Sequence, residues 1–199
     1  MIQQRIFDFE EQLIISEGIS DRHDIEQIIR CSIPYVVKVE QANLSDDMSG
    51  IDYWVTLESG RRLGIDTKVR TEDWRKRFNI DDVALETHSK IERDEKGNVT
   101  AGGKIGWTRN VKKKTDYILF IWDETGRYLC LPFPWLCNIF TENWEQWSKM
   151  YKRRSQFSKG LDGSRWESEC VFVPRKLLWN KVCHDFAGTY SPQQQEGAA

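Results

Sequence analysis

Two aspartates and a lysine lie close together in the segment SGIDYWVTLESGRRLGIDTKVR, which covers residues 49–70. Asp52 comes first, and the tripeptide Asp66-Thr67-Lys68 follows fourteen residues later. Carboxylate oxygens are the ligands that Mg²⁺ and Mn²⁺ prefer, and a lysine ammonium can stabilise the negative charge that develops on a phosphate during hydrolysis. If the fold brings these side chains together, the segment has the groups that metal-assisted phosphodiester hydrolysis needs.

The segment has the pattern of a β-hairpin with one apolar and one polar face. Apolar residues take the odd positions of 51–57 and three of the four odd positions of 63–69, and alternate residues of a strand point to opposite faces. A two-residue turn between the strands would mix the two faces. A three-residue loop at 58–60, with Gly60 in the left-handed conformation, keeps the apolar residues on the core side, and we therefore predict that loop.

This register places Asp52 directly opposite Asp66 on the polar face. Two carboxylates in that arrangement repel each other by roughly 1 kcal/mol, and a divalent cation between them would remove the repulsion. Lys68 lies on the same face two residues beyond Asp66, and Gly64 there is expected to leave room for a phosphate backbone. The alternative is an exposed hairpin face on which the charges form only surface ion pairs.

The elements that must position this hairpin alternate between helices and strands. Their order predicts one α/β or α+β domain over residues 1–190, with a mixed central sheet, a C-terminal strand–helix extension and a disordered tail at 191–199. We expect helices over 8–17, 21–31, 134–151 and 175–186, strands over 35–41, 81–89, 115–123, 126–133 and 169–174, a turn or short helix over 71–79, and a basic linker over 152–168.

Composition excludes some classes of protein and favours others. No apolar run approaches 18 residues, and the N-terminus lacks the pattern of a signal peptide, so we expect a cytoplasmic protein with no membrane span. The five cysteines have no CxxC spacing, which argues against a zinc site or a disulfide framework. Three basic clusters, at 61–77, 104–114 and 149–159, each lie close to a Trp or Tyr and favour contact with nucleic acid.

The pair Asp52 and Asp66-x-Lys68, on consecutive strands after a helix, resembles the core motif of the PD-(D/E)XK nuclease superfamily. The resemblance covers about residues 20–135 and implies a restriction-endonuclease-like αβββαβ core, at about 20–150, that cleaves DNA or RNA with Mg²⁺. Gly50-Ile51 precedes Asp52 where the family pattern has proline, and Asp66 stands where glutamate is commoner. The resemblance implies that Asp52 and Asp66 are metal ligands and that Lys68 is the catalytic lysine.

Many members of this superfamily add a metal-binding glutamate from the first core helix. We predict Glu26 for that role, because its helix directly precedes the strands, and Glu10 and Glu11 are the alternatives. Glu86 is an additional candidate if the strand over 81–89 pairs beside the hairpin. His88 and His184 are expected to be incidental, since the family needs no histidine.

Substrate contacts are expected from basic residues near the hairpin. Arg70 continues its polar face, while a flexible basic loop before the strand 115–123 could close on a duplex. Trp107 in that loop could stack on a base, although core packing is the favoured role. The loop residues expected to bind nucleic acid are Arg109, Lys112, Lys113 and Lys114.

These observations predict an endo- or exonuclease that uses Mg²⁺ or Mn²⁺ to hydrolyse nucleic acid, with DNA favoured over RNA. By analogy with the family, a compact chain of this kind fits a phage or mobile-element protein. A homodimer is a further expectation where two strands must be cut. The competing interpretations are a catalytically inactive nucleic-acid-binding or host-interaction protein on the same scaffold, and a structural partner in a larger complex.

Overall fold

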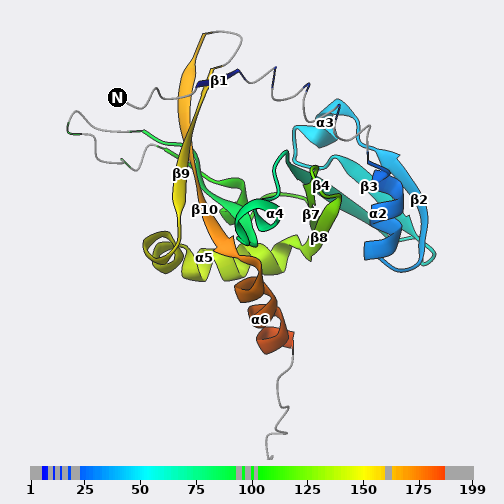
Figure 1. The fold of residues 1–199 in the computed structure, drawn as a ribbon. Coiled ribbons are helices and arrows are strands. Elements are labelled where there is room, and N and C mark those ends of the chain that lie inside the picture. The colour runs from blue at the N-terminus through cyan, green and yellow to red at the C-terminus, as the bar shows by residue number, and fades with distance from the viewer. Residues whose placement is uncertain are drawn as a thin grey trace, which may run out of the picture.

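The computed structural model describes residues 6–8, 11, 14, 18, 23–92, 96, 100, 103–159 and 163–186. Two five-stranded sheets make up most of the described fold (Figure 1). The first sheet contains, in spatial order, β2 (Val36–Gln41), β3 (Tyr53–Leu57), β4 (Arg62–Arg70), β7 (Tyr117–Trp122) and β8 (Arg127–Pro132). The second contains β1 (Ile6–Asp8), β9 (Arg153–Lys159), β10 (Arg165–Pro174), β5 (Asp82–Lys90) and β6 (Lys104–Ile105).

Helices cover the sheets and connect them. In Figure 1, β9 and β10 form a long ribbon, α5 crosses near the base of that ribbon, and α6 leads away from the end of β10. None of the helices in the described ranges is both long and apolar enough to cross a membrane. The helical elements are α2 (Ile25–Ser32), α3 (Leu44–Asp47), α4 (Trp74–Phe78), the 3₁₀ turn η1 (Trp107–Arg109), α5 (Phe133–Met150) and α6 (Arg175–Phe186).

The hairpin of β3 and β4 has the predicted register. Val55 lies opposite Leu63, and Tyr53 lies opposite Ile65. Gly60 has a φ of 80°, the left-handed conformation that this three-residue loop requires at its last position. The prediction of the loop and of the register is therefore confirmed.

Two hydrophobic clusters lie on opposite faces of the first sheet, and β7 contributes to both. Leu119 and Ile121 pack with α2 and the apolar face of the hairpin. Ile118 and Phe120 pack instead with α5 and with buried residues of β5 and β10. A strand buried on both faces is what its continuous apolar sequence predicts. Since Asp66 lies in register with Ile118, the polar face of β4 is turned toward the second sheet.

Most of the expected elements are present within a few residues of their predicted bounds. The expected helix over 8–17 falls largely outside the described residues, as does the tail at 191–199. Cys31, Cys130, Cys137 and Cys170 are free thiols, and Cys31 is exposed. The prediction of a linker over 152–168 is wrong, because this segment forms β9 and the start of β10. Most of β9 is polar and exposed, so no apolar alternation marks it as a strand.

The expected mixed central sheet corresponds to the first sheet, but β5 and β10 pair with each other in a second sheet that the sequence does not predict. The parallel strands β4 and β7 are connected through α4, β5, β6 and η1. In an αβββαβ core a helix lies between the third and fourth strands; here the short helix α4 lies between β4 and β7 together with β5, β6 and η1, and the long helix α5 follows β8. The restriction-endonuclease-like core therefore stays a prediction. The chain is therefore a mixed α/β protein of the expected α+β class, with its own order of elements around the hairpin.

Candidate functional site

Asp66 lies between the two sheets with 2% of its surface exposed. Lys68 Nζ donates a hydrogen bond to Oδ1 at 2.6 Å, and Lys113 Nζ lies 3.0 Å from Oδ2. Among the described residues, no side chain or backbone group donates a well-aligned hydrogen bond to Oδ2. A buried carboxylate needs paired positive charge, and here two lysines supply it from opposite ends of the same carboxylate.

Asp52 lies at the bend just before β3 and is held by the strand that carries Asp66. The backbone N–H of Thr67 donates to Asp52 Oδ2 at 2.7 Å, and the Thr67 hydroxyl donates to the same oxygen. Both bonds go to Oδ2, and no described residue donates a hydrogen bond to Oδ1. Burial, together with the neighbouring charge of Asp66, raises the pKa of Asp52. The negative charge of Asp66 therefore acts on Asp52, as expected from the predicted register.

Glu86 reaches the same region from β5 of the second sheet. The backbone N–H of Trp107 donates to Glu86 Oε2 at 2.8 Å. Burial raises the pKa of Glu86, and the positive charges of Lys68 and Lys113 act in the opposite direction. The strand β5 pairs with β10 and not with the hairpin, so the predicted route to the site is wrong. Glu86 faces the lysines because the second sheet packs against the polar face of β4.

The positive charge of Lys68 interacts with all three carboxylates of the site, Asp52, Asp66 and Glu86. Burial lowers its pKa, but the negative charges of Asp66, Asp52 and Glu86 more than offset burial, and the pKa of Lys68 is raised. The ammonium also lies 5.3 Å from the centroid of the Trp107 ring. Trp107 itself packs against Phe120 of the core, at 6.3 Å between ring centroids, which agrees with the expected packing role.

The predicted helix glutamate does not reach this group. Glu26 pairs with Arg30 on the same helix at 2.7 Å, and 54% of its side chain is exposed. The helix α2 packs on the apolar face of the hairpin, opposite to the face that carries Asp66. Glu11 is exposed, and its backbone N–H donates to Asp8 Oδ1; Glu10 lies outside the described residues. The structure therefore brings Glu86, and not Glu26, toward the aspartates.

Lys113 is buried in the site, although the sequence predicted a mobile surface lysine. Only 8% of its side chain is exposed. Gly50, with a φ of 83°, leaves the space that the ammonium occupies, since a Cβ at this position would overlap Lys113 Nζ. The Thr115 hydroxyl donates to the carbonyl of Gly50 and fixes this contact. Gly50 lies two residues before Asp52, and its missing side chain is the sequence signal for a close approach there.

The expected space at Gly64 is absent. A Cβ at Gly64 would lie 3.0 Å from the Ile51 side chain, which fills this position. Ile51 therefore packs on the polar face and not with the other odd-numbered residues, because the chain bends at Asp52 before β3 begins. Gly64 serves close packing, and the prediction that it admits a phosphate backbone is wrong.

The other basic residues expected at the substrate occupy different environments. Arg70 pairs with Asp82 at 2.7 Å. The Arg109 guanidinium lies 3.9 Å from the centroid of the Trp144 ring, and burial lowers its pKa. Lys112 and Lys114 are exposed. His88 packs edge-on against Trp144, and the side chain of His184 lies outside the described residues.

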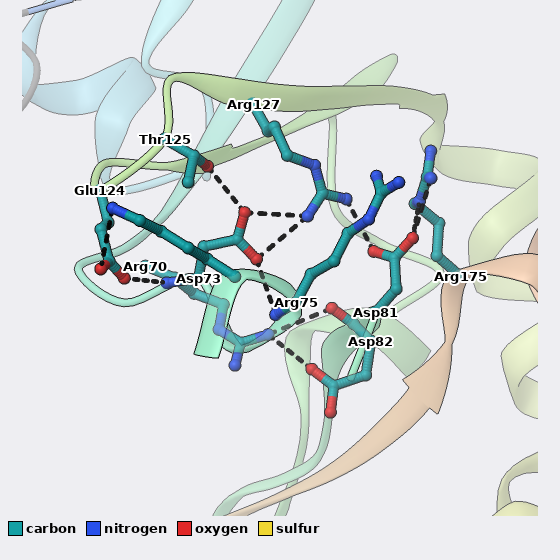
Figure 2. Close-up of polar contacts among 10 residues, drawn as sticks. Arg70, Asp73, Arg75, Asp81, Asp82, Glu124, Thr125, Arg127 and Arg175 are labelled. Atoms are coloured by element: carbon teal, nitrogen blue, oxygen red, sulfur yellow. Dashed lines mark hydrogen bonds and ion pairs between the residues drawn. The ribbon is translucent and has the colours of Figure 1, made fainter. Parts of the chain in front are cut away.

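A second group of carboxylates is paired with arginines (Figure 2). Asp73 accepts hydrogen bonds from Arg127 at 2.9 Å and from the Thr125 hydroxyl at 2.7 Å. Asp81 binds Arg127 at 2.7 Å and Arg175 at 2.8 Å. Burial alone would raise the pKa of both aspartates, but these hydrogen bonds and positive charges lower it. We call this group the arginine network; it joins α4 to β8 and to the start of α6.

The donors around Asp66 suit a hard divalent cation by their chemistry. Asp52, Asp66 and Glu86 offer carboxylate oxygens, and Asp66 Oδ2 is buried without a well-aligned hydrogen bond. Within the described ranges, however, no three His, Cys, Asp or Glu side chains are placed to hold one ion together. The Lys113 ammonium lies against Asp66 Oδ2, so a cation at that oxygen would have to displace it.

Comparisons with protein-family models, curated proteins and solved structures find no significant match to this chain. We therefore base the proposed function on the residues of the site. The resemblance to the PD-(D/E)XK motif stays a prediction that depends on Asp52, Asp66 and Lys68.

Proposed function

We propose that this chain is a metal-dependent nuclease that hydrolyses phosphodiester bonds of nucleic acid. The observation that carries the proposal is the buried Asp66 carboxylate, which is bound by Lys68 at 2.6 Å and has Asp52 as a close neighbour. The raised pKa values of Asp52 and Glu86 support it, because burial, and for Asp52 also the charge of Asp66, disfavours their negative charge, which a bound cation would stabilise.

Each residue has a role that follows from its position. Asp66 and Asp52 would hold Mg²⁺ or Mn²⁺ after Lys113 moves away from Asp66 Oδ2, and Glu86 would add negative charge nearby. The ion would supply Lewis acidity and lower the pKa of a bound water. Lys68 stays beside the reacting phosphate, where its ammonium stabilises the charge that builds up as the water oxygen attacks phosphorus and the bridging oxygen leaves. Thr67 keeps Asp52 oriented through two hydrogen bonds to Oδ2. DNA stays the favoured substrate, and a homodimer stays a prediction.

The proposal is tested by incubating the protein with labelled single-stranded, duplex and branched DNA, and with RNA. Each substrate is tested in Mg²⁺, in Mn²⁺ and in EDTA. We expect cleavage with a divalent cation and a loss of about 10³-fold or more in Asp66→Asn and Lys68→Ala. Glu26→Gln is the matched control, since it removes a carboxylate on the opposite face and should leave the rate unchanged. Cleavage that survives in Asp66→Asn and Lys68→Ala would disprove the proposal.

A second candidate is an inactive nucleic-acid-binding or host-interaction protein on this scaffold. The observation that favours it is the position of Lys113, whose ammonium lies at Asp66 Oδ2 where a cation would bind. If the two lysines permanently replace the metal, the cluster is structural. The same assay separates the candidates, because this protein would bind nucleic acid without cleaving any substrate in either metal.

A further inference from the structure

Three positively charged side chains lie close to a pair of stacked aromatic rings next to the site. The rings of Trp74 on α4 and Phe172 on β10 lie nearly parallel, at 8°, with centroids 5.8 Å apart. The charged groups of Arg154, Lys152 and Arg70 lie 4.3, 4.5 and 5.5 Å from the centroid of the Trp74 ring. A cation this close to an aromatic face is attracted by the ring, but the three cations also repel one another.

The carboxylates near these rings are already paired with other groups. Arg70 uses Asp82. Glu72 and Glu124 bind the basic residues of α4, and Glu72 also accepts from the Trp74 indole N–H. Among the described residues, neither Lys152 nor Arg154 forms an ion pair with a carboxylate. This surface therefore carries positive charge that the protein itself leaves uncompensated.

Arg70 connects this charged surface to the candidate active site, since its guanidinium lies near the Trp74 ring and its strand carries Lys68. Arg70 follows Lys68 by two residues on the same face of β4, which is a distance of roughly 6.6 Å along a strand. The backbone N–H of Phe172 donates to the carbonyl of Lys152 at 2.9 Å, which fixes the start of β9 at this place. Nucleotides follow one another at about 3.4 Å of rise along each strand of a duplex. A phosphate one or two nucleotides from the one at Lys68 would thus reach this surface.

We propose that Lys152 and Arg154, held against Trp74, bind a backbone phosphate of the nucleic-acid strand next to the phosphodiester at Lys68. The inference rests on the proposed function for the identity of the ligand. A phosphodiester fits because it is a singly charged anion with several acceptor oxygens, and arginine and lysine are the side chains that bind it. Arg70 adds a third positive charge behind them, partly offset by Asp82. The site contacts the backbone and predicts no base preference.

The test measures binding separately from cleavage. Fluorescence anisotropy of a labelled single-stranded DNA is recorded in EDTA for the parent and for Lys152→Ala/Arg154→Ala. We expect affinity to fall by about tenfold or more, and the slope of log K against log salt to become shallower by about 0.7, the value for one lost phosphate contact on a single strand. The matched control is Lys38→Ala/Lys176→Ala, which removes two exposed lysines of β2 and α6 that lie outside the three basic clusters and should change neither quantity.

The outcomes separate this inference from the proposed function. If Lys152→Ala/Arg154→Ala binds like the parent while cleavage still depends on Asp66, the inference is wrong and the function stands. If it loses affinity but the parent cleaves no substrate, the phosphate site stands and the nuclease proposal is wrong. If both double variants weaken binding equally, the effect is one of net charge and the inference is wrong. If the parent binds no nucleic acid, both are wrong.

Discussion

The protein contains two groups of buried and half-buried carboxylates that are neutralised to different degrees. In the arginine network, each aspartate has at least one guanidinium within hydrogen-bond distance, and the pKa values of Asp73 and Asp81 are lowered. In the candidate site, Asp52 accepts only from Thr67 among the described hydrogen bonds, and Glu86 from one backbone N–H. The pKa values of both site carboxylates are raised.

The fold thus neutralises the carboxylates of the arginine network more fully than it neutralises Asp52 and Glu86. An aspartate paired with arginine stabilises the folded chain and has no free oxygen for a ligand. A carboxylate with a raised pKa destabilises the folded chain at neutral pH, and such sites are typical of function. We therefore interpret the arginine network as structural and the group around Asp66 as functional.

The largest expected effect comes from breaking the arginine network. Replacing Asp73 with alanine leaves Arg127 without one of its partners and removes the cap of α4. We expect a loss of about 3 kcal/mol in the free energy of unfolding, since breaking a buried pair by removing one partner is strongly destabilising. Urea unfolding measures it, with Glu26→Gln, which breaks an exposed pair, as the control that should change little. Parent-like stability in Asp73→Ala would contradict the structural role.

The second prediction concerns Asp52, where stability and activity should change in opposite directions. Asp52→Asn keeps an oxygen that accepts from Thr67 and removes a charge that burial and Asp66 disfavour. We expect cleavage to fall by about 100-fold or more, while the free energy of unfolding in EDTA rises by up to about 1 kcal/mol. Cleavage rates and urea unfolding are measured on the same preparation. A destabilised Asp52→Asn would show that this carboxylate is structural, like those of the arginine network.

The third prediction tests whether the ammonium of Lys113 competes with a divalent cation for Asp66. Removing its ammonium in Lys113→Met leaves Asp66 Oδ2 with less positive charge beside it, so a divalent cation should bind more tightly, by about tenfold. Calorimetric titration with Mn²⁺ measures the affinity without requiring activity. Lys112→Met is the matched control, because Lys112 is the exposed neighbour. Unchanged or weaker Mn²⁺ binding in Lys113→Met would mean that Lys113 does not compete with the metal.

The sequence alone predicts the hairpin correctly, but it does not predict the second sheet that packs against the hairpin. The register of β3 and β4 follows from local rules, namely strand alternation and the loop that Gly60 allows. The strand β9 could not be recognised, because its residues are mostly polar and exposed, and pairing with β10 makes it a strand. The second sheet depends on contacts between residues far apart in the chain, which local patterns do not report.

The same limit explains which site residues were predicted. Asp52, Asp66 and Lys68 lie on one hairpin, so spacing alone placed them. The sequence offers Glu86 only as an additional candidate and favours Glu26, because the resemblance expects a glutamate from the helix that directly precedes the strands. Lys113 was assigned to a mobile loop, and only the tertiary packing at Gly50 places its ammonium against Asp66.

The smallest expected effect is the pH dependence that distinguishes the two groups. The lowered pKa of Asp73 means that its stabilisation is present above the ordinary aspartate value of 3.8 and is lost as pH falls through the lower pKa in the folded protein. The raised pKa of Asp52 has the opposite sign: its charge destabilises the folded state at neutral pH, and this penalty disappears as pH falls toward 3.8.

Urea unfolding of the parent, Asp73→Asn and Asp52→Asn between pH 7 and pH 3 tests these signs. The gain in Asp52→Asn, at most about 1 kcal/mol, should shrink first, in the range above pH 3.8, because protonation already neutralises Asp52 in the folded parent. The loss in Asp73→Asn should persist through that range and shrink only below it. If the gain in Asp52→Asn and the loss in Asp73→Asn shrink over the same pH range, the two carboxylates titrate alike. The contrast between a compensated structural group and an uncompensated functional one would then be wrong, even if each variant behaved as expected at pH 7.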